Sequence, residues 1–359
     1  MRSPINDKLE SEIIENIHNM SKLLDRDVVL MEVCGTHTMS IFRHGIKGIL
    51  PKNIKLISGP GCPVCVTPPQ YIDQAIQLAE KEEVIICTFG DMIRVPGTKG
   101  SLENERANGA SIKIVYSPLD CINIAKQNPH KQVIFLAVGF ETTSPVIGLT
   151  IKQAEIEGIQ NFFILSGLKQ LFAALHALFD SGEVNIDGLI CPGHVSSITG
   201  EEPYGFIPEK YKIPCVIAGF DSGEILISIY MLILQIINGK AEVENAYKKA
   251  GTESGNAKAL QVIKEVFHNT DDSWRGLGLI PGSGLKLSET YMNREARGFF
   301  GLEKPQWTGD GACKCGEVIK GLRIPTDCPL FGKACTPRNP VGACMVSSEG
   351  SCAAYYKYG

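Results

Sequence analysis

The sequence predicts an α/β fold in which parallel strands alternate with helices, followed by a cysteine-rich tail. Short apolar runs of mostly β-branched residues recur along the chain without alternating with polar residues, so both faces of each expected strand should be buried. Amphipathic stretches separate several of these runs, which is typical of a doubly wound sheet. Six of the 13 cysteines lie in the last 47 of the 359 residues, where apolar runs are few.

The expected elements follow in order from the N-terminus. Residues 7–25 should form a helix, because Leu9, Ile13, Ile17 and Met20 recur at helical spacing. Strands are expected over 28–33, 84–87, 133–138, 162–165, 188–191 and 215–218, and helices over 70–82, 118–127, 145–158 and 168–179. A polar helix is expected over 241–268, before a glycine-rich stretch at 274–287. We place domain boundaries near residues 30, 128 and 242.

Composition excludes several classes of partner. A net charge of −4 with 21% charged residues gives no basic face for nucleic acid. The most apolar run, 225–237, is too short to cross a bilayer, and the charged N-terminus lacks the apolar centre of a secretion signal. We therefore expect a cytoplasmic protein that does not contact membrane. In that reducing compartment, clustered cysteines indicate metal ligands or redox thiols before structural disulfides.

The first candidate site follows the strand at 28–33. Cys34 comes directly after this strand, Gly35 allows a tight turn, and His37 is close enough in sequence to share a site. A thiolate here could be a nucleophile or a soft-metal ligand, with His37 lowering its pKa or carrying protons. The alternative is a buried cysteine at a strand end, which is common.

Cys62 and Cys65 form the second candidate site, a Cys-Pro-x-Cys pair. Pro68 and Pro69 suit the first turn of the following helix, whose positive dipole end would stabilise a thiolate. The pair can close a small disulfide ring and so carry two electrons, or it can bind a soft metal. Half of a zinc site is the alternative, but the chain has no second CxxC.

Other strand ends carry polar residues with a less specific pattern. Asp91 and Arg94 follow one expected strand, Glu141 follows another, and His194 follows a third. In parallel sheets such residues share one edge, where ligands bind.

The tail provides the third candidate site. Its six cysteines stand in a glycine-rich, apolar-poor segment that cannot bury much core of its own: Cys313, Cys315, Cys328, Cys335, Cys344 and Cys352. A [4Fe–4S] cluster takes four thiolates. Zinc is the alternative, although these spacings are long for zinc knuckles. Two thiols would remain and could form a disulfide beside the cluster.

The motifs together resemble one family. The segments CGTHTMSIFRHGI, SGPGCPVCVTP, TFGDMIRVPG, VGFETT, CPGHVS and CPLFGKACTPRNPVGACMVSSEGSCAAYY are similar to those of the hydrogenase maturation factor HypD family. The resemblance implies two similar parallel-sheet α/β domains, at 31–127 and 128–241. It also implies an iron–sulfur domain at 242–359, on which the N-terminal helix, 1–30, packs.

The same resemblance implies the function and its residues. HypD proteins help to build the Fe(CN)2(CO) group of [NiFe]-hydrogenases, with a HypC-like chaperone and a HypE-like cyanide donor. The family pattern C-x12-C-x6-C-x16-C places the [4Fe–4S] cluster on Cys315, Cys328, Cys335 and Cys352. By the same comparison, Cys34 is the iron-anchoring thiol and Cys62 with Cys65 is the family's thiol pair.

The resulting hypothesis is a redox-active scaffold. Cys34 would hold the transient Fe(CN)2(CO) iron, the Cys62/Cys65 dithiol would supply two electrons, and the cluster would recharge the dithiol. His194, Glu141 and Asp91 would line the cleft and orient ligands. Two alternatives are a thiol-disulfide oxidoreductase that resembles ferredoxin–thioredoxin reductase, and a zinc-stabilised binding module.

Overall fold

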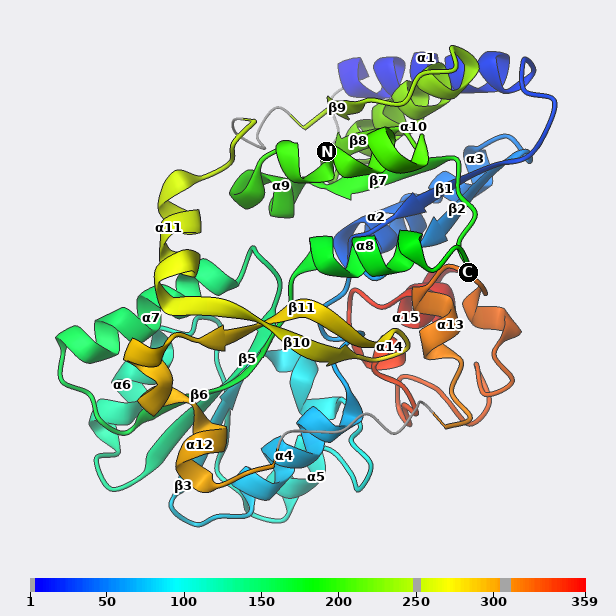
Figure 1. The fold of residues 1–359 in the computed structure, drawn as a ribbon. Coiled ribbons are helices and arrows are strands. Elements are labelled where there is room, and N and C mark those ends of the chain that lie inside the picture. The colour runs from blue at the N-terminus through cyan, green and yellow to red at the C-terminus, as the bar shows by residue number, and fades with distance from the viewer. Residues whose placement is uncertain (1–3, 248–252, 304–310) are drawn as a thin grey trace.

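The computed structural model describes residues 4–247, 253–303 and 311–359, and in these residues the strands form two parallel sheets and one antiparallel hairpin (Figure 1). Sheet A contains, in spatial order, β2 (Ile54–Ser58), β1 (Val28–Glu32), β7 (Gly188–Pro192), β8 (Cys215–Ala218) and β9 (Val243–Asn245). Sheet B contains β4 (Ile112–Ile114), β3 (Val84–Thr88), β5 (Gln132–Gly139) and β6 (Phe162–Leu168). The hairpin pairs β10 (Phe267–Trp274) with β11 (Gly278–Leu287). The predicted α/β class is confirmed.

Helices cover the faces of both sheets. Those that pack on sheet A are α1 (Pro4–Ser21), α2 (Gly35–Arg43), α3 (Ile46–Ile49), α8 (Leu171–Asp180), α9 (Gly193–Thr199) and α10 (Ser222–Ile237). Those that pack on sheet B are α4 (Pro69–Ala79), α5 (Leu102–Ala107), α6 (Asp120–Gln127), α7 (Ser144–Ile156), α11 (Ala257–Val266) and α12 (Ala296–Phe300). The tail forms α13 (Cys315–Ile319), α14 (Ala343–Val346) and α15 (Ser351–Tyr358). Short helical turns are η1 (Gly90–Arg94), η2 (Glu202–Tyr204), η3 (Ile207–Tyr211), η4 (Glu289–Arg294) and η5 (Pro325–Asp327).

The strands are buried on both faces, as their composition predicts. Every residue of β3, β6, β7 and β8 is buried. Alternate side chains of each strand therefore enter different core clusters, one on each face of the sheet. In β3, for example, Ile86 packs under α4 and Cys87 packs under α6.

The two sheets do not divide the chain at residue 128. The strands before that position, β3 and β4, and the strands after it, β5 and β6, belong to the same sheet B. Sheet A combines β1 and β2 with β7, β8 and β9 from beyond residue 187. The chain therefore builds part of sheet A, then sheet B, then the remainder of sheet A, which strand composition alone does not reveal.

Helix α1 packs on α10 and not on the C-terminal segment, contrary to the prediction. Ile13 and Ile17 share a core cluster with Ile225 and Ile229 of α10. Because α10 is itself strongly apolar, it buries one face on sheet A and leaves another for α1 (Figure 1). No helix in the described ranges combines the length and the apolar character needed to cross a membrane.

The region after residue 240 differs from its predicted helix. Of the expected helix over 241–268, the structure has β9 and α11, while residues 248–252 lie outside the described part of the chain. The hairpin β10–β11 was not predicted. It reaches from sheet B to the tail, where Trp274 is fully buried and the Arg275 amide donates to the Val66 carbonyl at 2.8 Å.

Candidate functional site

Cys34 lies at the start of α2, directly after β1. The backbone amides of Thr36 and His37 point toward its sulfur, an arrangement that favours a thiolate. Burial outweighs this effect and, together with the carboxylates of Glu349 and Glu32, raises the pKa of the Cys34 thiol to about 12. The thiol therefore keeps its proton at neutral pH. A soft metal cation is the kind of partner that can bind the sulfur and displace this proton.

Glu32 fixes the turn that carries Cys34. The carboxylate is 2% exposed, and its Oε2 accepts the Cys34 amide at 2.9 Å while its Oε1 accepts the Thr38 hydroxyl. Burial raises the pKa of Glu32 to about 7 in spite of these hydrogen bonds. Sequence reasoning missed this residue, although a carboxylate inside an otherwise apolar strand, two positions before Cys34, was a usable signal.

His37 is a neutral, buried side chain in this site. Its Nε2 donates to the Gly219 carbonyl at 2.9 Å, at the end of β8, and its Nδ1 is buried without a hydrogen-bond partner in the described structure. Burial lowers the pKa of His37 to about 4. His37 can accept a proton or a hydrogen bond at Nδ1, but it supplies no positive charge to Cys34 at neutral pH.

Phe220 connects the two predicted histidines. Its ring stacks on His194 with centroids 3.8 Å apart and on His37 with centroids 4.9 Å apart. The His194 ring is exposed, so it lies at the outer end of this stack. The structure thus brings both histidines to the edge of sheet A that carries Cys34.

The loop after β2 brings the Cys62–Cys65 pair to the same edge. Gly61 lies against the backbone of Val33 and Cys34, and its carbonyl accepts the Gly35 amide at 3.2 Å. Cys62 and Cys65 are joined as a disulfide, with Cα atoms 5.3 Å apart. α4 begins at Pro69, close to the predicted start.

The tail loop Ser347–Glu349 contacts three strand-end loops at once. Glu349 accepts the Thr36 hydroxyl at 2.6 Å, beside Cys34. The Ser347 Oγ lies 3.5 Å from Cys62 Sγ. The Ser348 hydroxyl and amide each donate to Asp91 Oδ2 at 2.8 Å, after β3. Residues from both sheets and from the tail therefore meet in one place.

A small cavity of about 10 Å³ lies at this meeting point. Its walls include Gly35 from the first loop, Cys62 and Cys65 from the second, and Cys344 and Glu349 from the tail. The disulfide therefore lies between the Cys34 loop and the cysteines of the tail.

The six tail cysteines line a second cavity, also of about 10 Å³. Thiol–thiol hydrogen bonds join Cys313 to Cys315, Cys315 to Cys344, and Cys344 to Cys352, and they perturb the pKa of each thiol. Cys328 and Cys335 complete the lining. In the described ranges, no set of three or more His, Cys, Asp or Glu side chains is arranged so that it could hold a metal ion.

The donors in this second cavity fit an iron–sulfur cluster by their chemistry. Six cysteines, five of them buried, offer the four soft thiolates that a [4Fe–4S] cluster requires. The cavity has room for about one water molecule, so the sulfur atoms must move apart to admit a cluster. The structure gathers all four predicted ligands and both remaining thiols, and it does not separate the two groups.

Glu141 lies apart from this cleft. Its Oε1 accepts the Leu171 amide at 2.8 Å and so holds the start of α8, and burial raises its pKa to about 7. The remaining cysteines lie in the sheet cores as buried pairs, one of Cys87 with Cys121 and one of Cys191 with Cys215.

Two parallel sheets thus present a buried thiol and a disulfide to a six-cysteine tail, and thiol groups are the donors that redox and soft-metal chemistry use. A family model named HypD, described as "Hydrogenase formation hypA family", matches residues 8–359. The chain belongs to this HypD family, whose curated members are hydrogenase maturation factors.

Similar curated proteins come from several bacteria. The hydrogenase expression/formation protein HupD of Azotobacter chroococcum mcd 1 is 45% identical over 341 residues, which are 93% of this chain and 90% of that protein. The hydrogenase maturation factor HypD of Escherichia coli is 42% identical over 352 residues, covering 98% and 94%. HypD of Rhodobacter capsulatus is 43% identical over 356 residues, covering 98% and 94%. These matches favour hydrogenase maturation over a general disulfide reductase.

Proposed function

We propose that this chain is a cytoplasmic scaffold on which the Fe(CN)2(CO) group of [NiFe]-hydrogenases is assembled, in complex with a HypC-like chaperone and a HypE-like cyanide donor. One observation carries the proposal. The tail loop Ser347–Glu349 brings the Cys34 loop, the Cys62–Cys65 disulfide and the six-cysteine cavity together at a single cleft. A scaffold that holds iron and delivers electrons needs this proximity.

Cys34 is the residue that would hold the iron. Low-spin iron with cyanide and carbon monoxide ligands is soft and favours a thiolate. Iron bound at the sulfur would displace the proton that burial otherwise keeps there. Glu32 holds the turn through the Cys34 amide, and His37 Nδ1 is a buried acceptor able to take up a proton.

The Cys62/Cys65 pair would supply electrons for cyanide transfer. The S–C bond of the donor's thiocyanate breaks with the two electrons that the dithiol provides, and the dithiol becomes the disulfide. The donor sulfur takes one of the two released protons and leaves as a thiol. The other proton passes to solvent, and cyanide passes to the iron.

The tail would hold the electron supply. Cys315, Cys328, Cys335 and Cys352 would bind a [4Fe–4S] cluster, which supplies electrons one at a time. Cys344 lines both cavities, so it lies between the cluster ligands and the disulfide.

Infrared spectroscopy of the anaerobically purified complex with the HypC-like partner tests the proposal. The intact chain should show CN and CO stretching bands, and Cys34→Ala should lose them together with its iron. Cys87→Ala removes another buried thiol, in the core of sheet B, and should keep the bands. If Cys34→Ala keeps iron with both kinds of band, Cys34 does not anchor the group.

A further inference from the structure

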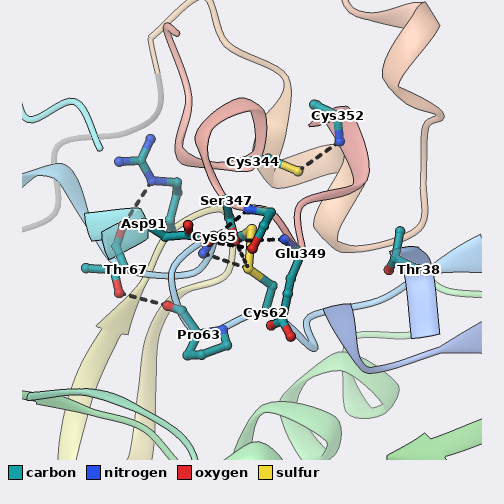
Figure 2. The surroundings of a disulfide bond; sticks show 12 residues. Thr38, Cys62, Pro63, Cys65, Thr67, Asp91, Cys344, Ser347, Glu349 and Cys352 are labelled. Carbon is teal, nitrogen blue, oxygen red and sulfur yellow. Dashed lines mark hydrogen bonds between the residues drawn. A yellow bond between two sulfur atoms is a disulfide. The ribbon is translucent and has the colours of Figure 1, made fainter. Parts of the chain in front are cut away.

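Ser347 lies between the Cys62 sulfur and the Asp91 carboxylate (Figure 2). Its Oγ is 3.5 Å from Cys62 Sγ and 3.4 Å from Asp91 Oδ2, and it accepts the Glu349 amide at 3.2 Å. The side chain is 1% exposed, so no bulk water competes for these contacts. Ser347 is thus a buried hydroxyl in direct contact with a sulfur of the disulfide.

The hydrogen bonds of Ser347 are complete only when Cys62 is reduced. A serine hydroxyl donates one hydrogen and accepts two. Glu349 occupies one acceptor position, and the hydrogen can point to Asp91. The remaining acceptor position faces the Cys62 sulfur, which carries a proton as a thiol and none as a disulfide.

We propose that Ser347 relays a proton between Cys62 and Asp91 when the Cys62–Cys65 disulfide opens or closes. The relay rests on the redox role proposed above for this pair and adds to it the route by which the proton travels. It assigns a chemical task to the tail loop beyond docking against the strand ends.

One contact singles out Cys62 as the sulfur that carries charge during this reaction. The Cys65 amide reaches Cys62 Sγ at 3.2 Å and would stabilise a thiolate there. At the other end of the relay, the Ser348 amide and hydroxyl both hold Asp91 Oδ2 in place. Asp91 is only partly buried, so solvent reaches this end of the relay.

The step balances with an external dithiol as the reductant, which takes the place of the tail cluster as the source of electrons. A thiolate of the reductant attacks Cys65 Sγ, and the S–S bond breaks while the Ser347 hydrogen passes to the leaving Cys62 sulfur. The Asp91 carboxylate takes a proton from water and passes it to the Ser347 oxygen, so that Asp91 and Ser347 both return to their starting states. The second reductant sulfur then displaces Cys65 and closes the oxidised ring, and Cys65 takes a proton from solvent. Two electrons and two protons thus pass from the reductant to the pair.

The test measures how fast dithiothreitol reduces the disulfide in the full chain under anaerobic conditions, with acid quenching, thiol alkylation and mass spectrometry. Ser347→Ala should slow reduction about tenfold or more, as expected for loss of proton transfer to a leaving group. Ser347→Thr keeps the hydroxyl and should restore the rate to within about threefold. Ser228→Ala removes another buried serine hydroxyl, which donates to the Glu224 carbonyl inside α10, and should stay within about twofold of the unmodified chain.

The direction of the change separates a relay from a structural role. A tail loop that merely covers the disulfide would, when loosened, expose it, and Ser347→Ala would then be reduced faster. An unchanged or faster rate for Ser347→Ala, or equal slowing in Ser347→Ala and Ser228→Ala, would overturn the relay. Failure of the proposed function would appear instead in the infrared bands, which this measurement does not use.

Discussion

Gly61 lies so close to Cys34 that position 61 has no room for a side chain. A Cβ atom there would stand 2.2 Å from the Cys34 nitrogen and 2.0 Å from the Val33 carbonyl carbon. Both neighbours are backbone atoms, which cannot rotate away. The absence of a side chain at Gly61 therefore sets how near the disulfide loop approaches the Cys34 loop.

Gly61→Ala should consequently push the two loops apart. We expect it to lower the free energy of unfolding by about 2 kcal/mol, as overpacking does, and to reduce the CN and CO bands of the complex. Gly48→Ala is the matched control, because Gly48 is exposed in α3 and a Cβ atom added there would meet no other atom within 4 Å. In urea denaturation that control should be neutral or more stable by about 0.5–1 kcal/mol. Equal stability and equal bands in the two variants would show that the close approach has no role.

The buried ion pair of Lys169 and Asp272 ties β6 to the hairpin. Lys169 is 1% exposed, and its Nζ donates to Asp272 Oδ2 at 2.7 Å and to the Ser273 carbonyl at 2.8 Å. Asp272→Ala leaves the lysine charge buried and unpaired, which should cost about 3–5 kcal/mol. Asp27→Ala, which breaks the exposed pair with Lys55, should change stability by less than about 1 kcal/mol. The urea midpoints of the two variants check this, and similar small losses would mean that the hairpin is not anchored by the pair.

Stability should fall as pH rises through the titration of Glu141. Burial raises the pKa of Glu141 from about 4.5 to about 7, so the folded chain binds its proton more tightly than the unfolded chain. Proton binding by Glu141 therefore adds its full contribution to the free energy of unfolding below about pH 4.5. This contribution falls between about pH 4.5 and 7, and it no longer changes above that range. A shift of this size corresponds to at most about 3 kcal/mol.

Glu141→Gln should remove this contribution. Relative to the unmodified chain, its free energy of unfolding should rise between pH 5 and about pH 7.5, by urea denaturation at each pH. Glu209→Gln, at an exposed position in η3, should run parallel to the unmodified chain. A Glu141→Gln curve that also runs parallel would contradict a buried, proton-binding Glu141.

Single serine substitutions should separate the predicted cluster ligands from the two other tail cysteines. After anaerobic reconstitution with iron and sulfide, Cys328→Ser should bind less than about a fifth of the iron of the unmodified chain, because a cluster needs all four thiolates. Cys313→Ser, whose side chain lines the same cavity, should bind nearly the full amount. If Cys313→Ser loses the iron and Cys328→Ser keeps it, the cluster ligands are the hydrogen-bonded thiols Cys313, Cys315, Cys344 and Cys352. If the unmodified chain instead contains zinc and no sulfide, the tail binds zinc and the predicted cluster is wrong.

Sequence composition predicted most of the strands because they are buried on both faces. It missed β2, where Lys55 is exposed and the apolar run is interrupted. It also missed β10, whose sequence from His268 to Ser273 is polar throughout and pairs as part of a hairpin. Which strands pair with which could not be predicted, since β1 and β7 resemble each other and every other buried strand in composition.

The candidate site shows the same division between local and distant information. Cys34, His37, Cys62 and Cys65 stand in short motifs, so the sequence alone could single them out as candidates. Ser347 acquires its importance only by contacting a sulfur 285 positions earlier in the chain. No local pattern encodes such a contact.

The interleaving of the two sheets has a consequence for the order of events during synthesis. β1 has β2 as its only neighbour until β7 is made, the carbonyl that holds His37 belongs to residue 219, and Glu349 arrives last. Cys34 is therefore among the first reactive groups to leave the ribosome and among the last to be enclosed, because its walls depend on contacts of large sequence separation. A nascent chain therefore carries this thiol before the pocket that encloses it exists, and during that time the thiol is open to any metal ion or oxidant.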